Sequence, residues 1–153
     1  MPHVATYVGL ARSSEQALAE SFRQVSEGHA AEADVFHMCA TLAEMSERHL
    51  TQLQPVVARY DLDEQDEPER LHADVLESVR SGAVGLLRDL QDLQLLATLV
   101  QSTWTVLYQA AQGLRDEELM EVAQSCSNET SRQLTWLTTH LKIAAPQALL
   151  VAT

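Results

Sequence analysis

The sequence predicts an all-α four-helix bundle formed by one domain, residues 1–153. Apolar residues recur three and four positions apart along four long segments, which is the spacing of a helix with one buried face. Helix-favouring Ala, Leu, Gln and Glu dominate, whereas runs of strand-favouring residues are almost absent. A chain of this length buries roughly 70% of its unfolded surface, so the predicted domain can fold without disulfides.

The first predicted helix ends at Gly28, a residue that commonly terminates helices. It begins near Val4 or, alternatively, at Ser13, because Ser13 and Gln16 have the spacing of a capping box. The turn at residues 28–31 is short, so the second helix should be an antiparallel neighbour. The predicted inward face consists of Val4, Tyr7, Ala11, Ser14, Leu18, Phe22 and Val25.

The second predicted helix begins near Glu32 or Asp34 and extends to Tyr60. Pro55 should kink this helix or end it near Gln54, because proline lacks the backbone N–H that the helix needs. The predicted inward face consists of Phe36, Cys39, Ala43, Ser46, Leu50, Leu53 and Val57.

An acidic connection, residues 61–82, follows the second helix. Pro68 can open a short helix there, with Leu71, Val75 and Val79 as its apolar edge. The connection is long enough to cross the whole bundle, but a simple up-down-up-down bundle also remains open.

The third predicted helix runs from about Ala83 to Gln112 and is stopped by Gly113. Leu95 and Leu99 lie off its inward face, so the middle of this helix is apolar nearly all round. The predicted inward face consists of Leu86, Leu90, Leu93, Ala97, Gln101, Trp104, Tyr108 and Ala111.

The fourth predicted helix opens with the acidic turn at Asp116 and ends at Pro146. The apolar tail at residues 148–151 should pack against the bundle. The predicted inward face consists of Leu119, Ala123, Cys126, Thr130, Gln133, Leu137 and His140.

A formal net charge of −12 disfavours nucleic acid and anionic membranes as partners and would suit a basic protein. The residues after Met1 lack the basic and apolar segments of a signal peptide, and the most apolar stretch, residues 86–100, carries charges. Cys39 and Cys126 fall at core-like positions and are expected to be reduced thiols. These features predict a cytoplasmic protein.

The four helices, the tight first turn and the long connection before the third helix resemble the ferritin-like superfamily. Members with active di-iron or di-manganese sites place a glutamate from each of two helices and a Glu-x-x-His pair from each of the other two in the core. The resemblance therefore implies a dinuclear carboxylate site in the middle of the bundle.

The sequence departs from that ligand pattern on every helix. The second helix has Ser46 three residues before His49, and the fourth has Cys126 three residues before Glu129. On the first helix the carboxylate nearest the inner face is Glu15, about 60° away from it. The third helix offers only Gln94 and Gln101 inward, while Asp89 and Asp92 point elsewhere. A complete di-metal site is therefore not expected.

The metal-ligand candidates that remain form two groups. His49 and Glu129 match part of the family pattern. His29, Glu32 and His140 would gather at one end of the core if the connection crosses the bundle, as a mononuclear zinc or iron site. In an up-down-up-down bundle His140 would lie at the opposite end, and each histidine would be an ordinary hydrogen-bonded residue.

The favoured function is that of a ferritin-like bundle without a complete di-metal site, a non-catalytic oligomerising or interaction protein that forms a homodimer. The apolar middle of the third helix supports this hypothesis. No cofactor is predicted for this favoured function. The alternative function is that of a metal-binding oxidoreductase or storage-type protein, with iron, manganese or zinc. A third hypothesis is ligand binding in the interior beside Trp104, Tyr108 and Trp136.

Overall fold

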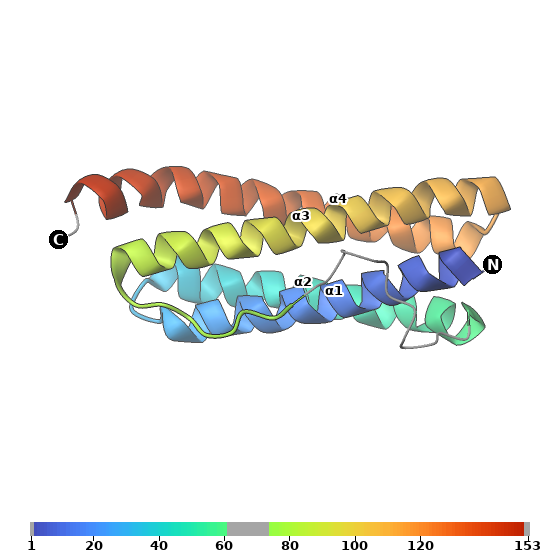
Figure 1. The fold of residues 1–153 in the computed structure, drawn as a ribbon, viewed down its shortest axis with the longest axis horizontal. Coiled ribbons are helices and arrows are strands. Elements are labelled where there is room, and N and C mark those ends of the chain that lie inside the picture. Colours follow the sequence, from blue (N-terminus) through green and yellow to red (C-terminus); the bar gives the residue numbers. More distant parts are fainter. Residues whose placement is uncertain (1, 61–73, 152–153) are drawn as a thin grey trace.

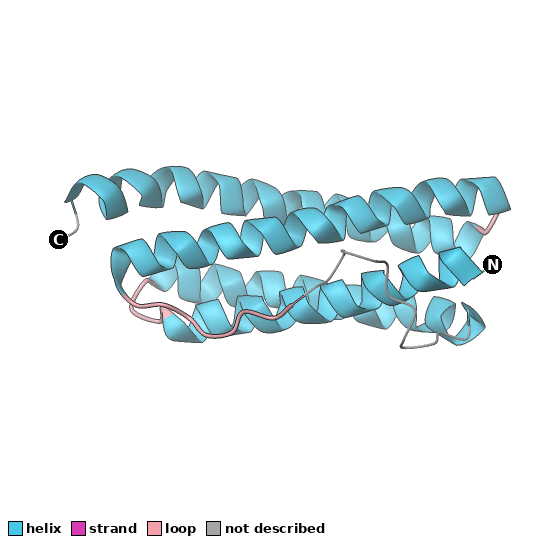
Figure 2. Cartoon of the chain, viewed as in Figure 1, coloured by secondary structure: helices cyan, strands magenta, loops and turns pink. Residues whose placement is uncertain are grey.

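A computed structural model describes residues 2–60 and 74–151 of the chain, and nearly all of them are helical (Figure 2). Helix α1 spans Pro2–Gly28, α2 spans Ala33–Tyr60, α3 spans Gly82–Leu114 and α4 spans Glu117–Pro146. A short π-helix, Gln147–Val151, continues α4. The predicted all-α four-helix architecture is confirmed, and the described residues include no strand.

The helix directions follow from which helix ends meet (Figure 1). Gly28 at the end of α1, Gly82 at the start of α3 and Gln147 after α4 line one cavity at one end of the bundle. At the other end the Tyr60 hydroxyl lies 2.8 Å from Asp116 Oδ2, so the end of α2 meets the start of α4. Helices α2 and α3 therefore run in the same direction, the order expected for a crossover connection.

The connection itself lies partly outside the described residues. Residues 61–73, which include Pro68 and Leu71, are not described. Residues 74–81 are not helical, so Val75 and Val79 do not belong to the short helix expected there. Both side chains are half-buried against the bundle instead.

Hydrophobic packing along four helix pairs forms the core. α1 packs along α2, α3 packs along α4, α1 also packs on α3, and α2 makes a smaller contact with α4. Because α1 touches two helices, its buried face is wide and reaches beyond a single stripe. Phe22, Leu53 and Trp104 are fully buried, and each removes a large apolar surface from water.

Several local expectations are corrected. Helix α1 begins at Pro2, so the alternative start at Ser13 is wrong. Helix α2 ends at Tyr60 as predicted, and Pro55 does not end it near Gln54. Phe36 is 38% exposed, since the neighbouring Val35 takes the buried position. The apolar tail at residues 148–151, expected to pack against the bundle, does so only at Ala148. The three residues after Ala148 are exposed.

In the turn between α3 and α4, the start of α4 at Asp116 is as predicted, but Arg115 and not Gly113 ends α3. Arg115 adopts a left-handed conformation with φ 56°, and its backbone N–H bonds to the carbonyl of Gln112. Asp116 then caps α4, because its Oδ1 accepts a hydrogen bond from the Leu119 N–H at 3.2 Å. Helix α3 thus ends at Leu114, one residue beyond the predicted stop.

Candidate metal centre

Glu15 is a fully buried carboxylate in the middle of α1. It lies seven residues after Val8 and seven before Phe22, both fully buried, so all three share the face that packs into the bundle. An ionised carboxylate in an apolar interior is stable only when hydrogen-bond donors or positive charges surround it. The surroundings of Glu15 therefore define the candidate site.

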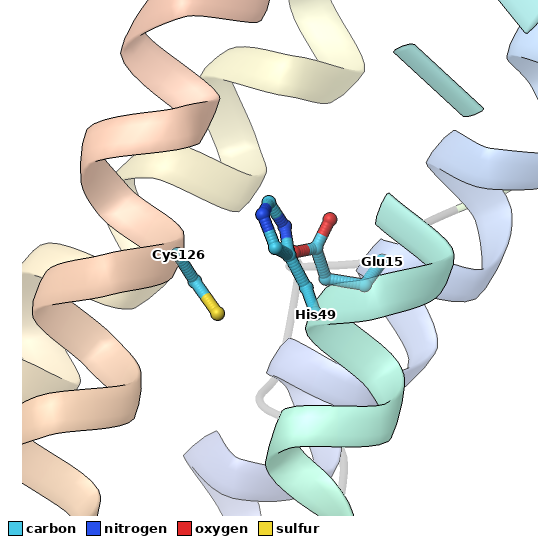
Figure 3. Close-up of side chains that lie close together, drawn as sticks. All are labelled: Glu15, His49 and Cys126. Atoms are coloured by element: carbon cyan, nitrogen blue, oxygen red, sulfur yellow. The ribbon is translucent and has the colours of Figure 1, made fainter. Parts of the chain in front are cut away.

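His49 of α2 lies between the carboxylates of Glu15 and Glu129. Figure 3 shows its ring beside Glu15. Its ring is fully buried; Nδ1 pairs with Glu15 Oε2, and Nε2 lies 2.9 Å from Glu129 Oε1. Burial alone would lower the pKa of His49, but hydrogen bonds and charge from Glu15 and Glu129 outweigh it and raise that pKa above its ordinary value. Without a metal, His49 is therefore an imidazolium that donates to both carboxylates.

Glu129 of α4 connects this site to the protein surface. Its side chain is 21% exposed and accepts a hydrogen bond from Arg48 Nη2 at 3.2 Å. Burial would raise the pKa of Glu129, but hydrogen bonds and charge from His49 and Arg48 lower it below its usual range. Glu129 is therefore ionised, with a positive group on either side.

Trp104 of α3 contacts the same oxygen of the Glu15 carboxylate as His49 does. Its indole Nε1–H donates to Glu15 Oε2 at 3.2 Å, and the side chain is fully buried. The other oxygen, Oε1, is buried and has no hydrogen-bond partner. Such an oxygen in a folded protein calls for a water molecule or an ion.

Cys126 of α4 completes a group of three metal-binding side chains. One ligand atom from each of Glu15, His49 and Cys126 lies within 4.8 Å of the other two, and all three residues are buried (Figure 3). The Cys126 thiol donates to Gln52 Oε1 at 3.4 Å. Burial raises the pKa of this thiol, and the charges of Glu15 and Glu129 raise it further, so it carries its proton without a metal.

The second cysteine takes no part in this group. Cys39 is fully buried and free, as is Cys126, so the expected reduced thiols are present. Burial raises the pKa of the Cys39 thiol to about 12, which keeps it protonated and unreactive. Cys126 therefore carries the thiol chemistry of this site.

The metal-ligand candidates from the sequence fall at two separate places. His49 and Glu129 are in contact in the middle of the bundle. His29, Glu32 and His140 line a cavity at the end where α1 finishes. Within residues 2–60 and 74–151, however, only Glu15, His49 and Cys126 bring three ligand atoms within 4.8 Å.

Two carboxylates are more deeply buried than the sequence predicts. Glu15 is expected beside the inner face of its helix and Asp89 away from the inner face of its own, yet both are fully buried. Their burial could have been predicted from residues spaced seven apart on the same helix. Val8, Glu15 and Phe22 form one such series, and Asp89, Leu96 and Thr103 form another, all of them buried.

Comparison of the chain with known protein families, curated proteins and solved structures found no match. Within the described part of the chain, no helix combines the length and hydropathy that crossing a bilayer requires.

Proposed function

We propose that this protein is a ferritin-like helical bundle that binds one transition-metal ion at Glu15, His49 and Cys126. The observation that carries the proposal is the convergence of three buried ligand atoms from three helices within 4.8 Å. A carboxylate, an imidazole and a thiol are the side chains that bind Zn²⁺ and Fe²⁺. Calcium and magnesium fit poorly, because they prefer sites made entirely of oxygen ligands.

The side chains around Glu15 favour one ion over two. A dinuclear centre in a helical bundle needs carboxylates from all four helices to neutralise both cations. Here α3 contributes Trp104, which donates to Glu15 where a further carboxylate ligand would be needed. Helix α2 likewise contributes Ser46, and its hydroxyl accepts from Gln133 Nε2 at 2.9 Å instead of binding a cation.

Charge balance supports exchange between protons and a dication at this site. Without metal, the His49 imidazolium balances Glu15, the Cys126 thiol is neutral, and Arg48 balances Glu129. A dication bound by the Glu15 carboxylate, a neutral imidazole and a thiolate is also balanced. Two protons leave as two positive charges enter, so the interior stays neutral in both states.

The proposal gives Glu129 a supporting role. Metal-bound histidines usually donate their second ring N–H to a carboxylate, which fixes the tautomer and the orientation of the ring. Glu129 Oε1 lies 2.9 Å from His49 Nε2, and Glu15 faces Nδ1. Nδ1 is therefore the nitrogen available to an ion shared with Glu15, while Glu129 holds the opposite edge of the ring.

The first test is a calorimetric titration of the protein with Zn²⁺ in buffers of different ionisation enthalpy. We expect one ion per chain and release of about two protons near neutral pH, because His49 and Cys126 both carry protons beforehand. For the same reason the affinity should weaken as the pH falls. Absence of stoichiometric binding, or binding without proton release, would contradict the proposed ligand set.

A second proposed function is homodimerisation through the outer face of α3. Leu95 is 72% exposed and Val106 is 43% exposed, and half-buried Leu99 lies on the same stripe between them. An exposed apolar stripe on one helix can pack against the same stripe of a second copy around a two-fold axis.

The Leu95→Glu variant tests this interface. If copies associate through α3, the substitution places a charge in the apolar contact, and light scattering should show a shift from dimer to monomer. Gln54→Glu, at an exposed position on α2 away from α3, is the matched control and should remain dimeric. An unchanged mass for Leu95→Glu would exclude α3 as the interface.

A further inference from the structure

A second polar cluster lies at the end of the bundle where α1 ends, α3 begins and α4 ends (Figure 1). It borders a cavity of about 360 Å³, within the size range of small-ligand sites. Its lining combines apolar Leu86, Ile143 and Ala144 with polar His29, Glu32 and His140. None of these residues belongs to the proposed metal centre.

Asp89 fixes the orientation of His29. Asp89 is fully buried, and its Oδ2 lies 2.8 Å from His29 Nε2 and 3.0 Å from the Arg80 backbone N–H. Its Oδ1 accepts from Arg80 Nη1 at 2.7 Å. Arg80 thus donates to this carboxylate from its backbone and from its guanidinium, which also places a positive charge beside it. Because a carboxylate oxygen only accepts, the hydrogen that His29 shares with Asp89 is on Nε2, and in the imidazole tautomer of this kind the other nitrogen is an acceptor.

This arrangement leaves His29 Nδ1 as a hydrogen-bond acceptor. The side chain is only 6% exposed, yet Nδ1 bonds to no group in the described ranges. It is also absent from the buried polar atoms left without a partner, so it retains contact with open space. Because His29 lines the cavity, that open space is the cavity itself. A ligand with an N–H or O–H group can donate to Nδ1 there.

Glu32 supplies the charge preference of the cavity. The Glu32 N–H bonds to the His29 carbonyl at 2.9 Å, so the turn after α1 places the two residues together. Its carboxylate is exposed and forms no ion pair with any residue of the described segments. Among the described residues that line the cavity, Glu32 is the only carboxylate, and none is a lysine or an arginine. Arg80, the nearest cation of the cluster, is held by Asp89 and Asp92.

From this geometry we infer that the cavity binds a small organic cation, an amine with an apolar body. The ammonium group pairs with Glu32 and donates to His29 Nδ1, while the apolar part rests against Leu86, Ile143 and Ala144. The volume suits a molecule of roughly ten non-hydrogen atoms. An anion of the same shape would meet the Glu32 carboxylate without a compensating positive charge.

The experiment is an NMR titration of the full chain with three probes of similar shape but different charge. These are the cation phenethylamine, the neutral 2-phenylethanol and the anion 3-phenylpropionate. The Trp136 indole reports on the site, because its ring stacks on the cavity residue His140 with centroids 4.7 Å apart. We expect saturable phenethylamine binding with shifts at Gly28, Gly82 and Trp136, and weaker binding of both other probes.

Matched variants separate this site from general attraction to an acidic protein. Glu32→Gln should weaken phenethylamine binding by about tenfold or more, because it removes the ionic partner and leaves the fold unchanged. Glu44→Gln removes another exposed carboxylate, from the middle of α2, and should have no effect. No saturation by about 10 mM, equal binding of the anion, or equal loss in both variants would overturn the inference. Since the cavity and the metal centre share no residue, failure here leaves the metal proposal intact.

Discussion

The His49→Ala variant is expected to lose more than about 100-fold in Zn²⁺ affinity, because it removes the imidazole that joins Glu15 to Glu129. No other described histidine belongs to a comparable group of ligand atoms. The measurement is competition of each protein against a chelator of known zinc affinity. His37→Ala is the control, since His37 is an exposed histidine on the same helix and should leave the affinity unchanged.

A second variant keeps this prediction testable if His49→Ala folds poorly. Removing His49 leaves the buried Glu15 carboxylate without its positive partner, which costs stability as well as a ligand. Cys126→Ala removes only a neutral thiol and its weak bond to Gln52, so folding should persist. Loss of zinc in a folded Cys126→Ala protein supports the ligand set, whereas retained wild-type affinity in both variants contradicts it.

The Asp89→Ala variant is expected to lose about 2–4 kcal/mol of unfolding free energy. The substitution removes the carboxylate that accepts from His29 Nε2 and from the Arg80 backbone N–H. His29 is buried, so its ring nitrogen loses a partner that water cannot easily replace. Arg80 contributes less to the loss, because its side chain is 44% exposed and water can solvate it. Urea unfolding followed by far-ultraviolet circular dichroism measures the change.

Asp92→Ala is the matched control for this prediction. Asp92 also pairs with Arg80, at 2.9 Å, but its side chain is 35% exposed. Its removal should cost less than about 1 kcal/mol, as is usual for ion pairs near the surface. Similar losses for Asp89→Ala and Asp92→Ala would mean that the buried His29–Asp89 contact contributes little to stability.

The helices were predictable because their apolar spacing is long and regular. The inward residues expected on α4 from Leu119 to Leu137 are all buried, and only His140 is half-exposed. The buried face of α2 was harder to predict, since its apolar residues lie on two adjacent stripes. Phe36 and Val35 belong to different stripes, and the packing of α2 on α1 selected Val35. Spacing within one helix cannot make that choice.

The candidate site was only half predictable for the same physical reason. His49 and Glu129 were found because they keep fragments of a ligand pattern, but Glu15 was assigned to the edge of a single stripe. Helix α1 contacts both α2 and α3, so its buried face extends far enough to enclose Glu15. Cys126 was placed inward but was interpreted as a small core residue, because its proximity to Glu15 and His49 depends on how three helices pack.

The most direct test of the metal centre is a Co²⁺ titration followed by absorption spectroscopy. Cobalt adopts zinc-like sites, and a bound cysteine thiolate adds a sulfur-to-cobalt charge-transfer band in the near ultraviolet. We expect this band to grow until one ion is bound per chain and to be absent in Cys126→Ala. Saturable binding without the band, or an unchanged band in Cys126→Ala, would show that Glu15, His49 and Cys126 do not hold the ion together.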